Sequence, residues 1–177
     1  MSKKIIVANW KMNPASLKEA KMLFVSAKKV ASRLSSVETV ICPPFIYLSE
    51  LGHSMSKLKL GAQDVSRFDF EGAHTGEVSA KMLKNSGIKY VIVGHSERRK
   101  LGETNEIINK KLGISLSLGL KAIFCVGEEV KDEEGNFREF IEQQINEGLK
   151  GLSQNLMKSL IIAYEPVWAI SGNAKSK

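Results

Sequence analysis

A strand-like run that ends in a cluster of polar side chains is the first place in the sequence where chemistry could occur. Residues 90–99 read Tyr-Val-Ile-Val-Gly-His-Ser-Glu-Arg-Arg. The β-branched and aromatic start is typical of a parallel strand that is covered on both faces, and Gly94 ends it. His95 then follows at the carboxyl end of the strand, where ligands bind in βα architectures. Two interpretations stand at this point: His95 belongs to a functional site, or it only caps the next helix.

Two further strand-like runs end in side chains of complementary chemistry. Asn9 and Lys11 follow the first run, and Glu165 closes the last one. A carboxylate base, an imidazole donor and a fixed cation suit the abstraction of a proton next to a carbonyl, because the donor and the cation stabilise the developing enolate oxygen. The alternative for each residue taken alone is an ordinary solvated side chain at a strand end.

The elements that would position these groups alternate regularly along the chain. Strands are predicted to begin near residues 4, 37, 59, 89, 121 and 159. Helices with apolar residues at intervals of three and four fill most of the intervals, and one helix ending at Gly119 is expected between the fourth and fifth strands. Since a βαβ unit takes about 30 residues, the spacing predicts six consecutive βα units in a single domain over 1–177.

A barrel fits this pattern better than an open, doubly wound sheet. No G-x-G-x-x-G motif follows the first strand. Polar residues follow at least five of the six strands, whereas an open sheet concentrates its ligand-binding groups at one switch point. A ring of polar loops at one end suits a (β/α)₈ barrel. The predicted fold class is therefore α/β, an incomplete barrel of six βα units.

Composition and charge narrow the classes of partner. The 177 residues are 43% hydrophobic and 25% charged, which is ordinary for a globular domain, and no apolar run approaches the ~20 residues of a membrane span. The net charge of +7 comes from basic residues in scattered pairs, which favours attraction of a small anionic substrate over nucleic-acid binding. Cys42 and Cys125 lie in strand-like runs without metal spacing, so we expect buried, reduced thiols in the cytoplasm.

Three blocks that carry the candidate residues resemble the signature blocks of the triosephosphate isomerases, namely residues 8–13, 94–99 and 163–170. Shorter segments at 61–65, 72–77 and 125–128 match as well, so the resemblance covers the whole chain in the right order. It implies a TIM barrel that uses no cofactor and no metal. It also implies the interconversion of dihydroxyacetone phosphate and D-glyceraldehyde 3-phosphate, a step of glycolysis and gluconeogenesis.

The resemblance implies a role for each candidate residue. Glu165 is the expected general base, and His95 is the expected neutral electrophile, whose protonation is opposed by a helix N-terminus, as is known for this family. Lys11 is the expected cation that faces the phosphate and the enediolate. Glu97 is expected to orient Lys11, and Asn9 is expected to help place the substrate.

The last residues of the chain resemble a lid. Pro166, Val167 and Trp168 resemble a stiff hinge, which would let the lid close over the phosphate and exclude water. The family lid usually reads Ala-Ile-Gly-Thr-Gly-Lys, and this chain has Ser171 in place of the first of those glycines. The resemblance thus implies a phosphate contact from the backbone of Ser171, in a lid whose glycines are shifted.

Residues 63–78, with Thr75 near the tip, resemble an arm that inserts into a second subunit. The resemblance therefore implies a homodimer. The alternative is a plain surface excursion, although a loop of about 15 residues usually has a function.

The chain is shorter than a complete barrel, which takes roughly 250 residues. We expect the sequence to be a truncated part of a longer chain. It then lacks the seventh and eighth units, and the first and sixth strands are open edges. A naturally short protein would need a partner that supplies the missing quarter. A second candidate function is a non-catalytic module that binds a partner through residues 63–78. Other phosphate-binding barrels fit less well, since they do not need Lys, His and Glu at these strand ends.

Overall fold

Six parallel strands form one curled sheet in the computed structural model, which describes residues 4–52, 57–131, 135 and 137–170. Each strand pairs with its neighbours in the sequence, from β1 to β6. This order confirms the incomplete barrel and differs from a doubly wound sheet, whose strand order reverses at a switch point. The strands are β1 (Lys4–Asn9), β2 (Val37–Cys42), β3 (Leu58–Ala62), β4 (Tyr90–Val93), β5 (Lys121–Val126) and β6 (Leu160–Tyr164).

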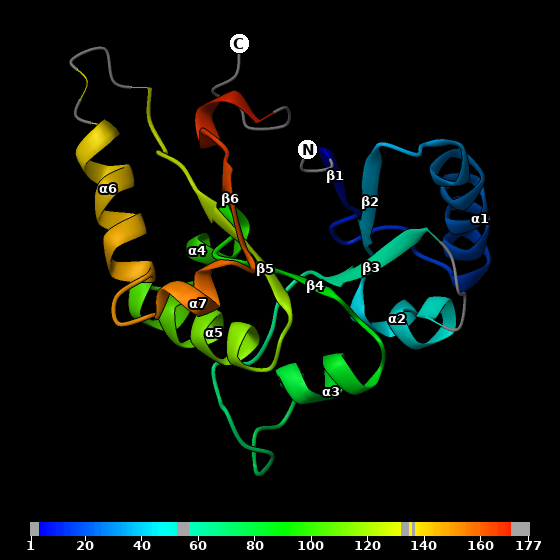
Figure 1. Cartoon of the computed structure of the whole chain (residues 1–177), viewed down its shortest axis with the longest axis horizontal. Coiled ribbons are helices and arrows are strands. Elements are labelled where there is room, and N and C mark those ends of the chain that lie inside the picture. The colour runs from blue at the N-terminus through cyan, green and yellow to red at the C-terminus, as the bar shows by residue number, and fades with distance from the viewer. Residues whose placement is uncertain (1–3, 53–56, 132–134, 136, 171–177) are drawn as a thin grey trace.

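Helices cover the outer side of the curled sheet (Figure 1). None of the helices in the described ranges has the length and apolar character that crossing a bilayer requires. The helices are α1 (Leu17–Arg33), α2 (Phe45–Gly52), α3 (Ala80–Asn85), α4 (Ser96–Lys100), α5 (Asn105–Ser117), α6 (Phe137–Gly148) and α7 (Gln154–Met157), and a 3₁₀ turn, η1, spans Val167–Ala169.

The segment between β4 and β5 differs from the expectation of one helix, because it forms two, α4 and α5. Gly102 breaks the segment with a positive φ of 97°, which an L side chain rarely adopts. Thr104 then caps α5, since its hydroxyl oxygen accepts a hydrogen bond from the N–H of Ile107 at 3.3 Å. The short helix α7 was also not expected from the sequence.

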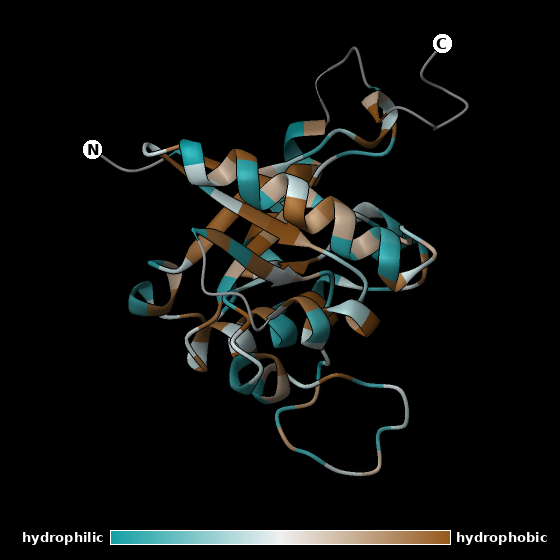
Figure 2. Cartoon of the chain, turned by 90° about the vertical axis from the view of Figure 1, so that its right-hand side faces the viewer, coloured by the Kyte–Doolittle hydropathy of each residue, from teal (hydrophilic) through white to brown (hydrophobic). Residues whose placement is uncertain are grey.

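Two apolar layers bury the two faces of the strands. Side chains alternate across a strand, so one set fills the inside of the curl and the other packs under the helices. The inner layer includes Tyr90, Ile92 and Ile123, whereas the outer layer includes Leu112 of α5 and Phe124 of β5. Figure 2 shows the apolar strands enclosed by helices with mixed surfaces. All four residues of β4 are buried, as the sequence predicted for a strand covered on both faces.

Among the described residues, the edge strands β1 and β6 have no further strand on one side, as expected for six units. Ile6 of β1 is 52% exposed and Ile162 of β6 is 48% exposed. Ile5 and Ile161 pack against the inner layer but are only partly buried. Both edges therefore leave apolar side chains as well as backbone hydrogen-bonding groups uncovered.

Candidate active site

His95 lies at the end of β4, and its role as the cap of the next helix is confirmed. It caps α4, because its Nδ1 accepts a hydrogen bond from the N–H of Glu97 at 3.2 Å. A neutral imidazole with Nδ1 as acceptor carries its proton on Nε2. Nε2 lies 3.6 Å from Oε2 of Glu165, and His95 is only 8% exposed. The cap therefore fixes the ring so that its N–H points toward the carboxylate.

Glu165 follows β6 and is held by the neighbouring strand. Its N–H donates to the carbonyl of Val126 at 2.9 Å. A Cβ on Gly127 would overlap the backbone carbonyl of Glu165, so the close approach needs a glycine there. The Glu165 side chain is 39% exposed. A carboxylate that is fixed through its backbone but still open to solvent can reach a bound small molecule.

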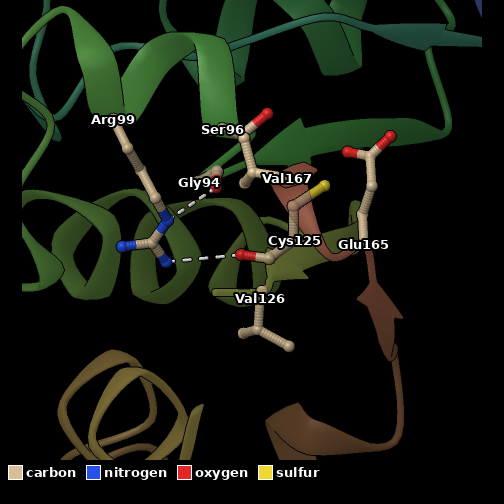
Figure 3. Close-up of a pocket in the computed structure, with 8 residues that line it drawn as sticks. Gly94, Ser96, Arg99, Cys125, Val126, Glu165 and Val167 are labelled. Atoms are coloured by element: carbon tan, nitrogen blue, oxygen red, sulfur yellow. Dashed lines mark hydrogen bonds between the residues drawn. The ribbon is translucent and has the colours of Figure 1, made fainter. Parts of the chain in front are cut away.

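Cys125 lies beside this carboxylate (Figure 3). Burial raises the pKa of the Cys125 thiol to about 12, and the charge of Glu165 adds to the shift. Burial also raises the pKa of the Cys42 thiol to about 12. Both thiols are free and buried, as the sequence indicated. They are protonated at neutral pH and contribute packing rather than nucleophiles.

Lys11 has a left-handed backbone, with φ of 54°, which is uncommon for a residue with a side chain. Its N–H donates to Oδ1 of Asn9 at 2.9 Å. The side-chain amide of Gln63 donates to the carbonyls of Lys11 at 2.9 Å and Cys42 at 2.8 Å. The two polar side chains therefore hold a strained conformation in place, and the Nζ of Lys11 reaches Oε1 of Glu97 at 2.9 Å.

Glu97 connects the cation and the imidazole. Its second oxygen, Oε2, lies 3.6 Å from Nδ1 of His95. The hydrogen bond from Lys11 lowers the pKa of the Glu97 carboxyl, partly against the effect of burial. A hollow of about 170 Å³ is lined by Asn9, Lys11, His95 and Glu97, among others. The carboxyl ends of β1, β4 and β6 thus bring Lys11, His95 and Glu165 to one region. Glu97 lies at Nδ1 of the imidazole ring, and the Glu165 carboxylate lies on the other side of the ring, at Nε2.

A buried charge network next to this region was not anticipated from the sequence. Lys111 contacts Oδ1 of Asp64 at 2.6 Å and Oε1 of Glu103. Arg98 contacts the same two carboxylates at 3.0 and 3.1 Å. Burial raises the pKa of the Asp64 carboxyl, although Lys111 partly offsets the effect. The network ties α4 to α5 and to the end of β3, and so supports the turn that carries His95. The sequence signal that could have indicated this network is the polar pair Gln63 and Asp64, which comes directly after a buried strand.

The expected hinge residues lie directly after Glu165. Pro166 has φ of −63°, and Val167 and Trp168 begin the turn η1. The indole N–H of Trp168 donates to Oε1 of Glu128 at 2.8 Å, and the hydroxyl of Tyr164 lies 3.1 Å from both oxygens of the same carboxylate. Glu128 was missed as a partner of this turn. Ser171 lies outside the described residues.

Thr75 is not part of this cluster within its own chain. It is exposed on a loop that projects from the body of the molecule (Figures 1 and 2). The loop is braced near its tip by stacking of the Phe68 and His74 rings, whose centroids lie 3.7 Å apart. Across the described ranges, no group of three or more His, Cys, Asp or Glu side chains is arranged to hold a metal ion.

Comparison with known proteins gives a consistent picture. The family model described as triosephosphate isomerase matches residues 4–177. The protein named triosephosphate isomerase from Natranaerobius thermophilus is 45% identical over 98% of this chain and 69% of its own length. Those from Dictyoglomus thermophilum and Carboxydothermus hydrogenoformans are 43% and 44% identical, over 100% and 96% of this chain and 72% and 68% of their own lengths. The chain thus spans about seven-tenths of these relatives.

Proposed function

The chain belongs to the triosephosphate isomerase family, and from that premise we propose how its residues carry out the reaction. The reaction interconverts dihydroxyacetone phosphate and D-glyceraldehyde 3-phosphate, which requires a proton to move between two adjacent carbons. The observation that carries the proposal is the 3.6 Å approach of His95 Nε2 to Glu165 Oε2, with Lys11 joined to the same histidine through Glu97.

Glu165 is the proposed base. Its carboxylate is partly open to solvent, so a bound triose phosphate can present a carbon-bound proton to it. The carboxylate removes the proton from one carbon and returns it to the next, with an enediolate between the two steps, while a second proton passes from the hydroxyl oxygen on one carbon to the carbonyl oxygen on the other.

His95 and Lys11 are the proposed groups that stabilise the enediolate oxygen and the phosphate. The Nε2–H of His95 is directed toward Glu165 because Nδ1 accepts a hydrogen bond from the backbone N–H of Glu97. It can donate a hydrogen bond to the carbonyl oxygen as negative charge develops there. The ammonium of Lys11 adds a full positive charge, and Glu97 holds it in position. Asn9 acts by fixing the backbone of Lys11 beside the substrate.

The hinge and the lid are proposed from the resemblance together with the contacts of η1. Pro166 limits rotation at the base of the lid, and Val167 and Trp168 are anchored by Glu128. Lid closure would exclude water from the enediolate. A phosphate contact from the backbone of Ser171 stays a prediction.

A cytoplasmic homodimer is the proposed assembly. The projecting loop that carries Thr75 supports it, because an exposed and internally braced arm suits insertion into a second chain. The 170 Å³ hollow beside Lys11 and Glu97 could receive such an arm. Two buried, free thiols fit a reducing compartment.

The test is conversion of D-glyceraldehyde 3-phosphate by chains that differ only at Glu165. Because β1 and β6 are open edges, we expect measurable conversion when a segment with two further βα units is supplied. In that complex Glu165→Gln should lower the rate by about 10²–10⁴-fold, the usual contribution of a general base.

Glu129→Gln is the matched control, since Glu129 is an exposed carboxylate just after β5 that makes no described contact with the site. It should leave the rate unchanged. Equal rates for the wild-type chain and Glu165→Gln would rule out the proposed base, and would leave the partner-binding module as the better interpretation.

A further inference from the structure

Arg99 is a half-buried cation that the proposed reaction does not use. Its Nε donates to the carbonyl of Gly94 at 2.9 Å, and its Nη2 donates to the carbonyl of Cys125 at 3.3 Å (Figure 3). Its Nη1 donates to Oδ1 of Asn105 at 2.6 Å. A guanidinium has five N–H groups, so one N–H on each terminal nitrogen is left over.

The partners of Arg99 are all neutral. Among the described residues no carboxylate lies within ion-pair distance of it, whereas the adjacent Arg98 contacts both Asp64 and Glu103. Burial lowers the pKa of the Arg99 guanidinium, and the nearby acidic groups of Cys125 and Glu103 act in the opposite direction. A cation removed from water without a counter-charge is costly, so a bound anion would stabilise this arrangement.

A cavity of about 270 Å³ opens beside the guanidinium, and donors line it. Thr104 accepts from the N–H of Ile107, which leaves its own O–H proton available. Ser96 adds a second hydroxyl, and Val167 of η1 forms an apolar part of the wall.

Two carboxylates also line this cavity. Glu103 directs Oε1 to the cations Arg98 and Lys111, and its buried Oε2 has no hydrogen-bond partner among the described residues. Glu129 is exposed to solvent. Neither carboxylate approaches Arg99 closely enough to replace a bound anion.

We propose that this cavity is an anion site for a phosphate group, either inorganic phosphate or a small phosphate monoester, with Arg99 as its charged ligand. The volume is just below the range of pockets that take drug-sized molecules, which fits a small ion. The cavity is distinct from the 170 Å³ hollow of the proposed active site, because Lys11 and His95 do not line it. Bound phosphate would lie against Val167, next to Trp168.

The test is titration of the chain, in complex with the supplied segment of two further βα units, with inorganic phosphate, followed by ³¹P line broadening at micromolar protein. A parallel titration with methyl phosphate identifies whether inorganic phosphate or a phosphate monoester binds more tightly. Lys11→Met removes the cation of the 170 Å³ hollow and should retain this binding. Arg99→Met should weaken it at least tenfold.

A second variant tests the cavity without touching the Arg99 hydrogen bonds. Gln143 is exposed on α6 and lines the cavity, so Gln143→Trp should fill it and also weaken binding at least tenfold. Gln154→Trp, on the exposed face of α7, is the matched control and should bind as the wild type does. The proposal is overturned if Lys11→Met abolishes all phosphate binding, or if Gln143→Trp binds as tightly as Gln154→Trp.

Discussion

At the scale of single residues, the position of one ammonium lowers the pKa of its neighbour. The hydrogen bond from Lys11 is the largest cause of the lowered Glu97 pKa, and Lys100 contributes a minor Coulombic effect. Lys11→Met should therefore raise the pKa of Glu97 toward its ordinary value. The measurement is a ¹³C NMR titration of the Glu97 carboxyl, with Lys100→Met as the control that should shift it much less.

The same pKa shift predicts a pH dependence of stability. Because the folded pKa of Glu97 is depressed, its contribution is present above the ordinary carboxyl pKa and is lost as the pH falls through the folded value. The stability difference between the wild type and Lys11→Met should hence shrink in acid. A larger difference at acid pH than at neutral pH would contradict the assignment of Lys11 as the dominant partner.

The two thiols give a second prediction for single residues. The pKa values of Cys42 and Cys125 are both raised to about 12 by burial, and only a thiolate attacks a disulfide reagent. Neither thiol should react with an aromatic disulfide at pH 8 in the folded chain, whereas both should react in denaturant. Rapid reaction of either thiol without denaturant would show that the inner layer is open to solvent.

The sequence located the three chemical groups because each one follows a strand-like apolar run. Lys11, His95 and Glu165 could be predicted to meet once the strands were placed in parallel order. The hydrogen bonds of Gln63 to the Lys11 carbonyl could not be predicted, since they depend on how the loop after β1 crosses the end of β3. The left-handed φ of Lys11 had no sequence signal either, because the residue is not a glycine.

At the scale of elements, one glycine controls how closely β5 and β6 approach. A Cβ on Gly127 would meet the Glu165 carbonyl, which is backbone and cannot rotate away. Gly127→Ala should therefore destabilise the fold by about 1–3 kcal/mol, as overpacked cores do, and should displace Glu165. Urea unfolding measures the change.

Gly52→Ala is the control for that substitution. Gly52 ends α2, and a Cβ there would have its nearest neighbours at 3.6 and 4.0 Å, which is ordinary contact. It should change stability by less than about 0.5 kcal/mol. Equal effects of the two substitutions would mean that the close approach at Gly127 does not hold the strands.

Element positions were predictable where periodicity and end signals agreed. The six strands begin within about a residue of their predicted starts, and Ser79 caps α3 as expected, accepting from the N–H of Met82 at 3.1 Å. The division into α4 and α5 was missed because the apolar positions of α5 dominate the pattern. Gly102 and Thr104, a break followed by a cap, were the signal that could have revealed it.

At the scale of the whole molecule, the open side of the sheet determines what the chain can do alone. The layers of a complete barrel take four side chains each from alternate strands, so six strands leave each layer incomplete. The outward-facing Ile6 and Ile162 are also about half exposed within the described residues. The backbone groups on the free sides of β1 and β6 are a template for association with other strands.

We therefore expect the 177-residue chain expressed alone to be poorly soluble and to convert D-glyceraldehyde 3-phosphate near the background rate. Co-expression with the three-tenths of the Natranaerobius thermophilus relative that the chain does not span should raise both solubility and conversion. Solubility, size-exclusion chromatography and the isomerisation rate measure the outcome.

Ile162→Lys is the matched variant. A charge on the open edge should reduce self-association but also weaken the complex, because the added segment must cover the same face. A soluble monomer with a sharp melting transition in the absence of the segment would show that the incomplete layers are stable without closure.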